Sequence, residues 1–349
     1  GGHLSRMQNA LSASSIPSIL SYILGGAASV ATGRSDVGAA IVSAGSSIAS
    51  RNFLSYSRGE EASADHAALK LLDKTKQSAQ GFLEFMKVLE DQELLSSSSQ
   101  DPYILSHPIS SDRVRTIQHH VDQSPYSQSP TPPKFIEMHA RMKAKVIAFI
   151  SPSEQTLRMY KNSNQNIESR YARTIAYYRK GNIKKAISLL NHLISEYPFD
   201  PYFIELRGKI LFDNGQIDDA LIDYQKAHDM LPDSATVSKE LAYAQIESGR
   251  TELLKLAIRN LRMALAKEPK SSDSWHQLAI AYGRTGEKGQ SSLALAEEAL
   301  LKGKPDVAKY HSGLAEQLFP TGTREWLQAQ DIQIFARDLE KRLKKQQER

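Results

Sequence analysis

Two acidic residues, Glu61 and Asp65, lie four positions apart in the stretch SYSRGEEASADHAALKLL, residues 55–72. On a helix, positions i and i+4 are neighbours, so the two carboxylates share one face. A solvated helix start explains such a pair well, because the helix dipole favours acids in the first turn. The same face turns apolar at Ala68 and Leu72, which is unusual for a solvated start. Spacing alone therefore leaves half of a metal site as the second interpretation.

The composition describes a water-soluble globular class of protein. The chain has 349 residues, of which 40% are hydrophobic and 24% charged, enough for two ordinary domains. The net charge of +5 is dispersed, and no DNA- or RNA-binding motif appears. No cysteine is present, which excludes disulfides and thiolate metal sites and suits a periplasmic or cytosolic bacterial protein.

The first fifty residues are unusual. The chain opens GGHLSRMQ, without an initial Met or a signal segment, and we expect it to begin inside a domain. Residues 16–50 contain two apolar, small-residue stretches around GRSD at positions 33–36. Neither reaches the roughly 18–20 apolar residues of a membrane span. A buried or active-site-covering helical hairpin is predicted, and a membrane-surface or re-entrant hairpin is the alternative.

Two further amphipathic helices are predicted before a linker. The first covers about 78–95, with apolar positions Phe82, Phe85, Val88 and Leu89. Residues 97–108 have the composition of a loop. The second helix starts at Ser110 or Ser111, and its apolar stripe is Val114, Ile117 and Val121.

The stretch SPYSQSPTPP, residues 124–133, holds four prolines and predicts an extended linker. A helix is expected at about 135–150. We place the domain boundary at this linker.

The C-terminal half repeats with a period of 34 residues. Gly181, Gly215 and Gly249 keep this spacing, as do Pro198 and Pro232. This is the period of the tetratricopeptide repeat, a helix–turn–helix unit. The glycines are expected to adopt positive φ at the inter-helix turns, and the prolines to end the second helices. A unit cannot bury its apolar face alone, so the array is predicted to stack into a solenoid.

Smaller departures from the repeat are also visible. The third unit carries three extra residues before Ala257, and the fourth opens with Trp275 and Tyr282 in the signature positions. Trp326, Ile332, Ile334, Phe335 and Leu339 suggest a closing cap. The predicted fold is all-α, with room for minor β structure in the first domain. The predicted parts are 1–123, a linker 124–134, a connecting helix 135–166, about four repeats over 167–305, and a cap with a basic tail over 306–349.

The stretch around Glu61 resembles the third-ligand helix of a zinc metallopeptidase family, that of the HtpX and Ste24 proteases. The family pattern is E-x-x-x-D after Ser-Arg, and Glu61 rather than Glu60 fits it, because only Glu61 has Asp at +4. LSHPISSDRV is similar to the family segment S-H-P-x-x-x-x-R, and GGHLSRM resembles the residues that follow H-E-x-x-H. The repeats match the BepA-like branch of this family. The resemblance covers nearly the whole chain. The order and spacing of the motifs together make it more specific than any one motif alone.

The resemblance implies a set of site residues. Glu61 is expected to be the third zinc ligand and Asp65 an outer partner that orients a ligating His. His107 is expected beside the metal, where it could act as a further ligand, cap the site or contact substrate. Arg113 is expected to hold the local loop or steady an oxyanion, as an auxiliary catalytic residue, and a plain surface charge on its helix is the alternative.

The departure from the family is the missing H-E-x-x-H. None of the ten histidines is followed by Glu, so two imidazole ligands and the general base are absent. We interpret this as truncation and expect the chain alone to be inactive. The resemblance implies a periplasmic Zn²⁺ endopeptidase for quality control of envelope proteins, possessing a signal peptide and a repeat domain that binds unfolded envelope proteins or the outer-membrane assembly machinery. A non-catalytic tetratricopeptide adaptor or chaperone is the alternative.

Overall fold

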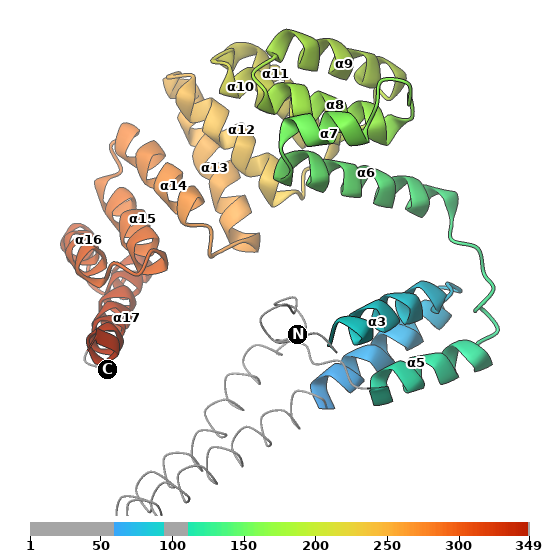
Figure 1. The fold of residues 1–349 in the computed structure, drawn as a ribbon. Helices are drawn as coiled ribbons and strands as arrows, with labels where there is room; N and C mark the ends of the chain where they lie inside the picture. The colour runs from blue at the N-terminus through green and yellow to red at the C-terminus, as the bar shows by residue number, and fades with distance from the viewer. Residues whose placement is uncertain (1–58, 94–110, 348–349) are drawn as a thin grey trace, which may run out of the picture. The chain divides into compact units, whose positions relative to one another are not determined.

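A computed structural model describes residues 59–93 and 111–347, and all regular elements in these ranges are helices (Figure 1). The all-α prediction is confirmed for this described part. The predicted 16–50 hairpin and the 97–108 loop lie outside it. The chain divides into two compact units between Ile136 and Glu137, each described here by itself.

The N-terminal unit has three described helices around one core: residues 59–74, α3 (Gln80–Glu93) and α5 (Ser111–Gln123). Leu69 of the first helix, Leu83 of α3 and Ile117 of α5 are almost fully buried against one another. The predicted stripe of α5 is confirmed, because Val114, Ile117 and Val121 are all buried.

The predicted stripe of α3 is wrong in two positions. Phe85 and Val88 are exposed, whereas Leu83, Met86 and Leu89 face the core. Apolar residues cover more than one side of this helix, so periodicity alone does not tell which side meets its neighbours. The burial of Leu83 and Met86 follows from packing on α5.

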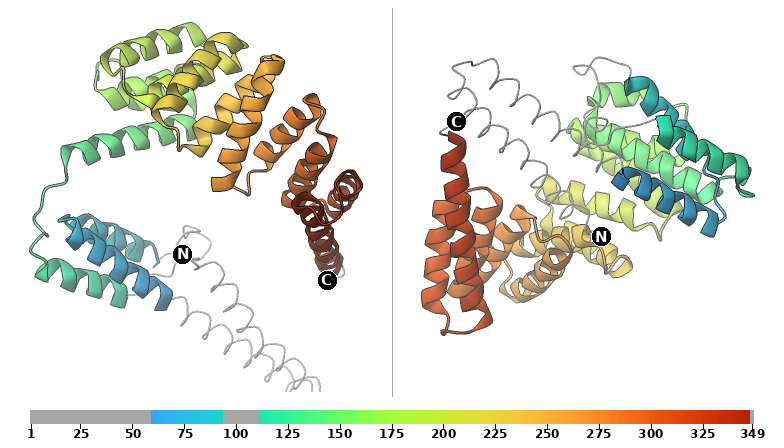
Figure 2. Two further views of the ribbon diagram at one scale, coloured as in Figure 1. Left: turned by 180° about the vertical axis from the view of Figure 1, so that it is seen from behind. Right: turned by 90° about the horizontal axis from the view of Figure 1, so that it is seen from below.

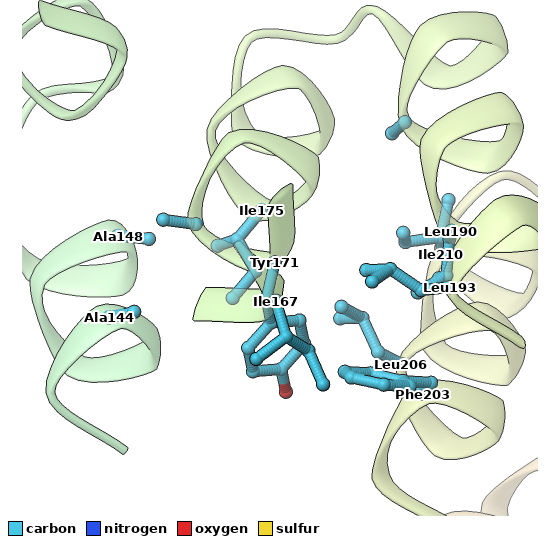
Figure 3. Close-up of a cluster of buried hydrophobic side chains, with 12 residues drawn as sticks. Ala144, Ala148, Ile167, Tyr171, Ile175, Leu190, Leu193, Phe203, Leu206 and Ile210 are labelled. Carbon is cyan, nitrogen blue, oxygen red and sulfur yellow. The ribbon is translucent and has the colours of Figure 1, made fainter. Parts of the chain in front are cut away.

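Helix α6 (Pro133–Ile150) begins at the last proline of the predicted linker. Proline is tolerated at the first helical position, because its missing N–H has no partner within a helix there. The short helix α7 (Ser153–Met159) follows. Ala144 and Ala148 of α6 join the core of the first repeat (Figure 3).

The repeats form four successive helix pairs. Their bounds are α8 (Ile167–Arg179) and α9 (Ile183–Glu196), α10 (Pro201–Asp213) and α11 (Ile217–Met230), α12 (Ala235–Glu247) and α13 (Thr251–Lys267), and α14 (Ser272–Arg284) and α15 (Lys288–Leu301). Each pair packs on the next, so the tetratricopeptide-like array is confirmed (Figures 1 and 2).

The turns within the pairs have the predicted backbone. Gly181, Gly215 and Gly249 have φ of 78°, 76° and 68°. The residue after the glycine closes the turn: the Asn182 N–H donates to the Tyr177 carbonyl at 2.9 Å. This 6→1 hydrogen bond needs a left-handed residue inside the turn, which glycine supplies at low cost.

The three extra residues of the third unit lengthen a helix. Helix α13 has 17 residues, whereas α11 has 14. Ala257, Leu261 and Ala264 remain buried, so the insertion keeps the packed face in register.

A further pair, α16 (Pro305–Leu318) and α17 (Arg324–Gln347), follows α15 (Figure 2). Of the residues expected in a cap, Ile332 is buried, but Ile334 and Phe335 are exposed. Ala308, Ala315, Ala329 and Ala336 supply much of the contact instead. Within the described residues, no helix has the length and apolar character needed to cross a bilayer.

Candidate metal-site helix and its arginine

Arg113 lies between the two acidic residues of the motif. Its Nε donates to Asp65 Oδ2 at 2.6 Å, and its Nη2 donates to Asp65 Oδ1 at 2.9 Å. The same Nη2 is 3.2 Å from Glu61 Oε2. We call Glu61, Asp65 and Arg113 the carboxylate–arginine cluster. A planar guanidinium matches a carboxylate with two parallel bonds, which fixes both side chains.

The cluster is shielded from solvent. The Asp65 and Arg113 residues are 6% and 7% exposed, and the Glu61 side chain is 18% exposed. A buried charge needs a partner, and here one cation serves two carboxylates. The Glu61 carboxylate is the member closest to solvent, and thus the one best placed to meet a ligand.

Arg113 is buried because it lies on the face of α5 that packs against the rest of the N-terminal unit. Arg113, Ile117 and Val121 are spaced by four, so the arginine continues the apolar stripe into the first turn of the helix. The stripe packs against Leu69 of the 59–74 helix, one turn beyond Asp65. The hydrophobic contact therefore holds the guanidinium opposite Asp65.

A second polar contact fixes the same two helices at their other end. Ser124 Oγ donates to Asp73 Oδ1 at 2.7 Å, and His120 Nε2 lies 3.3 Å from that oxygen. The first turn of α5 thus contacts the first turns of the 59–74 helix, and the last turn of α5 contacts the last turn of that helix. The two helices run parallel, and their register is set at both termini. His120 is half-buried in this contact.

The structure brings together three of the four predicted site residues. Glu61, Asp65 and Arg113 form one cluster, while His107 lies outside the described residues. The predicted roles of Glu61 as ligand, of Asp65 toward a histidine and of Arg113 toward an oxyanion stay predictions. The pairing of Arg113 with both acids was not anticipated, although its spacing from Ile117 already indicated a buried position.

The donor atoms of the cluster suit one position of a zinc site. Zinc accepts carboxylate oxygen together with imidazole nitrogen, commonly in sets of three or four. Within the described residues, no group of three or more His, Asp or Glu side chains could hold a metal ion. The Glu61 carboxylate could supply one oxygen ligand of such a set, and Asp65, which accepts two hydrogen bonds from Arg113, could support it.

The helix that carries Glu61 and Asp65 lies in a segment that matches a known peptidase family. Residues 1–121 match the model of peptidase family M48. This segment of the chain is therefore similar to M48 peptidases. The M48 match includes the whole carboxylate–arginine cluster and ends within α5, at its buried Val121.

The chain is also similar to a curated relative, the beta-barrel assembly-enhancing protease of Yersinia pestis. It is 23% identical over 263 residues, which are 73% of this chain and 52% of the relative. The chain spans about half the length of the curated relative that it matches. This finding and the helical repeats confirm the expected BepA-like combination of an M48 segment with tetratricopeptide-like repeats.

Solved structures of MamA are similar to the helical part. One is 21% identical and covers 52% of this chain and 99% of its own, with a TM-score of 0.38. Another, from Desulfovibrio magneticus RS-1, is 16% identical and covers 53% of this chain and 96% of its own, with a TM-score of 0.37.

Proposed function

We propose that the protein containing this chain is a zinc-dependent endopeptidase of the bacterial periplasm, acting in quality control of outer-membrane proteins. The observation that carries the proposal is the carboxylate–arginine cluster, built on a helix inside the M48 match. The name of the Yersinia pestis relative, a protease that enhances β-barrel assembly, supports the substrate class.

In this proposal Glu61 is the carboxylate ligand of the zinc. Zinc, when bound, would polarise a scissile carbonyl and acidify a water molecule. Arg113 orients Glu61 through its 3.2 Å contact. Asp65 holds Arg113 by two hydrogen bonds, so the three side chains act as one preorganised group.

The repeats would recruit the substrate or an assembly partner. Arrays of helix pairs present extended surfaces that suit polypeptide binding. We infer that unfolded or misassembled envelope proteins, or the outer-membrane assembly machinery, bind there. This assignment separates recognition by α8–α17 from chemistry in the N-terminal unit.

The experiment is a cleavage assay with the natural full-length protein and a denatured outer-membrane β-barrel protein. We expect proteolysis that a zinc chelator abolishes and that added zinc restores. The Glu61→Gln variant should be inactive, while Glu60→Gln should retain activity. Binding of the β-barrel protein without any zinc-dependent cleavage would contradict the proposal and favour a non-catalytic adaptor or chaperone.

A further inference from the structure

Helix α6 has apolar side chains on two opposite faces. The inner face carries Ala144 and Ala148, which are fully buried against Tyr171 and Ile175 of α8 (Figure 3). Both alanines belong to the hydrophobic core of the first repeat. This contact fixes which side of α6 is turned away from the repeats.

The outer face carries a continuous ridge of large apolar side chains. Met138, Met142, Val146 and Ile150 are spaced by four, and all are exposed, with Met142 at 60% and Ile150 at 76%. Their Cα positions span twelve residues, or about 18 Å of helix. Phe135 is also exposed, one turn before Met138. Single exposed apolar residues are ordinary, but a contiguous ridge over three turns marks an interaction surface.

The cations of α6 divide between these two faces. Arg141 forms ion pairs with Glu137 and Asp200, and its guanidinium lies 4.6 Å from the centre of the Phe203 ring. Lys145 lies 3.8 Å from Glu205 of α10. These two cations join α6 to the first part of α10, in the second repeat.

The remaining lysines border the ridge. Lys134 and Lys143 are exposed, and within the described part of the chain neither has a carboxylate at ion-pair distance. The one acid of α6, Glu137, is paired with Arg141. The outer surface therefore combines an apolar centre with uncompensated positive charge and no free carboxylate.

We propose that the α6 ridge docks an amphipathic helix of a partner protein whose margins are acidic. Side chains at i±4 intervals form a ridge that fits the groove of another helix, which is the commonest helix-packing arrangement. Methionine suits such a surface, because its flexible thioether side chain adapts to the partner. Acidic margins would pair with Lys134 and Lys143. This surface is independent of the proposed peptidase site.

A helical partner fits the ridge better than a lipid surface does. Helices that bind membrane surfaces combine many Lys and Arg with Trp, Phe or Leu. The ridge holds two methionines, a valine and an isoleucine, and Phe135, Ile136 and two exposed lysines lie beside it. The opposite face of α6 is already committed to α8, so one narrow ridge is presented, as in helix-in-groove recognition.

The test is fluorescence anisotropy of a labelled designed peptide with the full chain. The peptide has five helical turns (about 18 residues), with leucine at positions a and d and glutamate at positions e and g. We expect saturable binding that Met142→Glu weakens at least about tenfold. Lys143→Glu should weaken binding several-fold and reduce its salt dependence. Ile222→Glu, on the exposed side of α11, is the matched control and should bind as the wild type does.

Several results would overturn the proposal. A peptide with lysine in place of glutamate should bind about tenfold more weakly, and equal binding would contradict the charge match. No Met142-dependent peptide binding would also contradict it. If Met142→Glu instead abolishes binding to phosphatidylcholine–phosphatidylglycerol vesicles, the ridge is a lipid site. If it abolishes a concentration-dependent dimer in sedimentation, the ridge is a self-association site. Met142 is exposed, so circular dichroism should show an unchanged fold in every variant.

Discussion

Arg113 donates two hydrogen bonds to Asp65, at 2.6 and 2.9 Å, across 48 positions of the sequence. This contact ties α5 to the helix that carries Glu61. It links the motif segment to a second segment of the M48 match. The stability of the N-terminal unit and the position of Glu61 therefore depend on the same arginine.

Replacement of Arg113 by methionine should destabilise the N-terminal unit by about 3–5 kcal/mol, because it leaves Asp65 buried without a cation. Hydrogen exchange of helix 59–74 measures this locally, while the repeats serve as an internal reference. The control is Arg115→Met. Among the described residues Arg115 pairs only with Asp112, on the surface, so this substitution should change stability by less than about 0.5 kcal/mol. Equal protection in both variants would contradict a structural role for the cluster.

Replacement of Gly208 by alanine should destabilise the repeats by about 1–3 kcal/mol. An added Cβ would lie 3.1 Å from the Tyr224 ring and 3.3 Å from Asp223 Cβ. The ring is buried, and Arg207 binds Asp223 through two hydrogen bonds of 2.7 Å, so neither neighbour moves easily. Denaturant unfolding gives the free-energy change.

Gly313→Ala is the matched control for Gly208→Ala. Gly313 lies within α16, and an added Cβ would meet no atom within 4 Å. Alanine should therefore stabilise the helix by about 0.5–1 kcal/mol. If Gly208→Ala instead stabilised the protein as Gly313→Ala does, helix propensity would outweigh the close approach of α10 and α11, which would contradict the prediction.

Glu205 should make the stability of the repeats depend on pH. Burial, followed by the neighbouring Glu240 carboxylate, raises the pKa of Glu205 to about 7, against the opposing charges of Lys145 and Lys209. The unfolded pKa is about 4.3, so the folded state binds the proton more tightly. Protonation of Glu205 therefore adds up to about 3 kcal/mol to the free energy of unfolding. This stabilisation is fully present below about pH 4 and is lost as pH rises through 7.

Unfolding free energies between pH 4 and pH 8 check this titration. Glu205→Gln should remove the fall in unfolding free energy as pH rises. Glu240→Gln should reduce this fall, because one of the causes of the raised pKa of Glu205 is removed. A decline of the same size in the wild type and in Glu205→Gln would assign it to other groups.

The repeats were predictable because their signals are local. Glycine at positive φ, proline beyond a helix end and alanine at close contacts act within one turn of the chain. The position of Gly215 thus predicts its turn without knowledge of the rest of the fold. The same holds for the three extra residues that lengthen α13.

The cluster and the α3 core were less predictable because they depend on distant partners. Glu61 and Asp65 were identified by spacing, but the cation that joins them lies on another helix. Phe85 and Val88 were expected in a core stripe, yet packing on α5 selects Leu83 and Met86. Periodicity identifies apolar faces and does not say which face a neighbour covers.

The zinc content of the natural full-length protein tests the central claim most directly. Elemental analysis after dialysis should find about one zinc per chain in the wild type and in Glu60→Gln, and far less in Glu61→Gln, with unchanged circular dichroism. Asp65→Asn should lower zinc affinity by about 10–100-fold, because Arg113 and Glu61 lose their orientation. Full zinc content in Glu61→Gln would contradict the assignment of Glu61 as a zinc ligand.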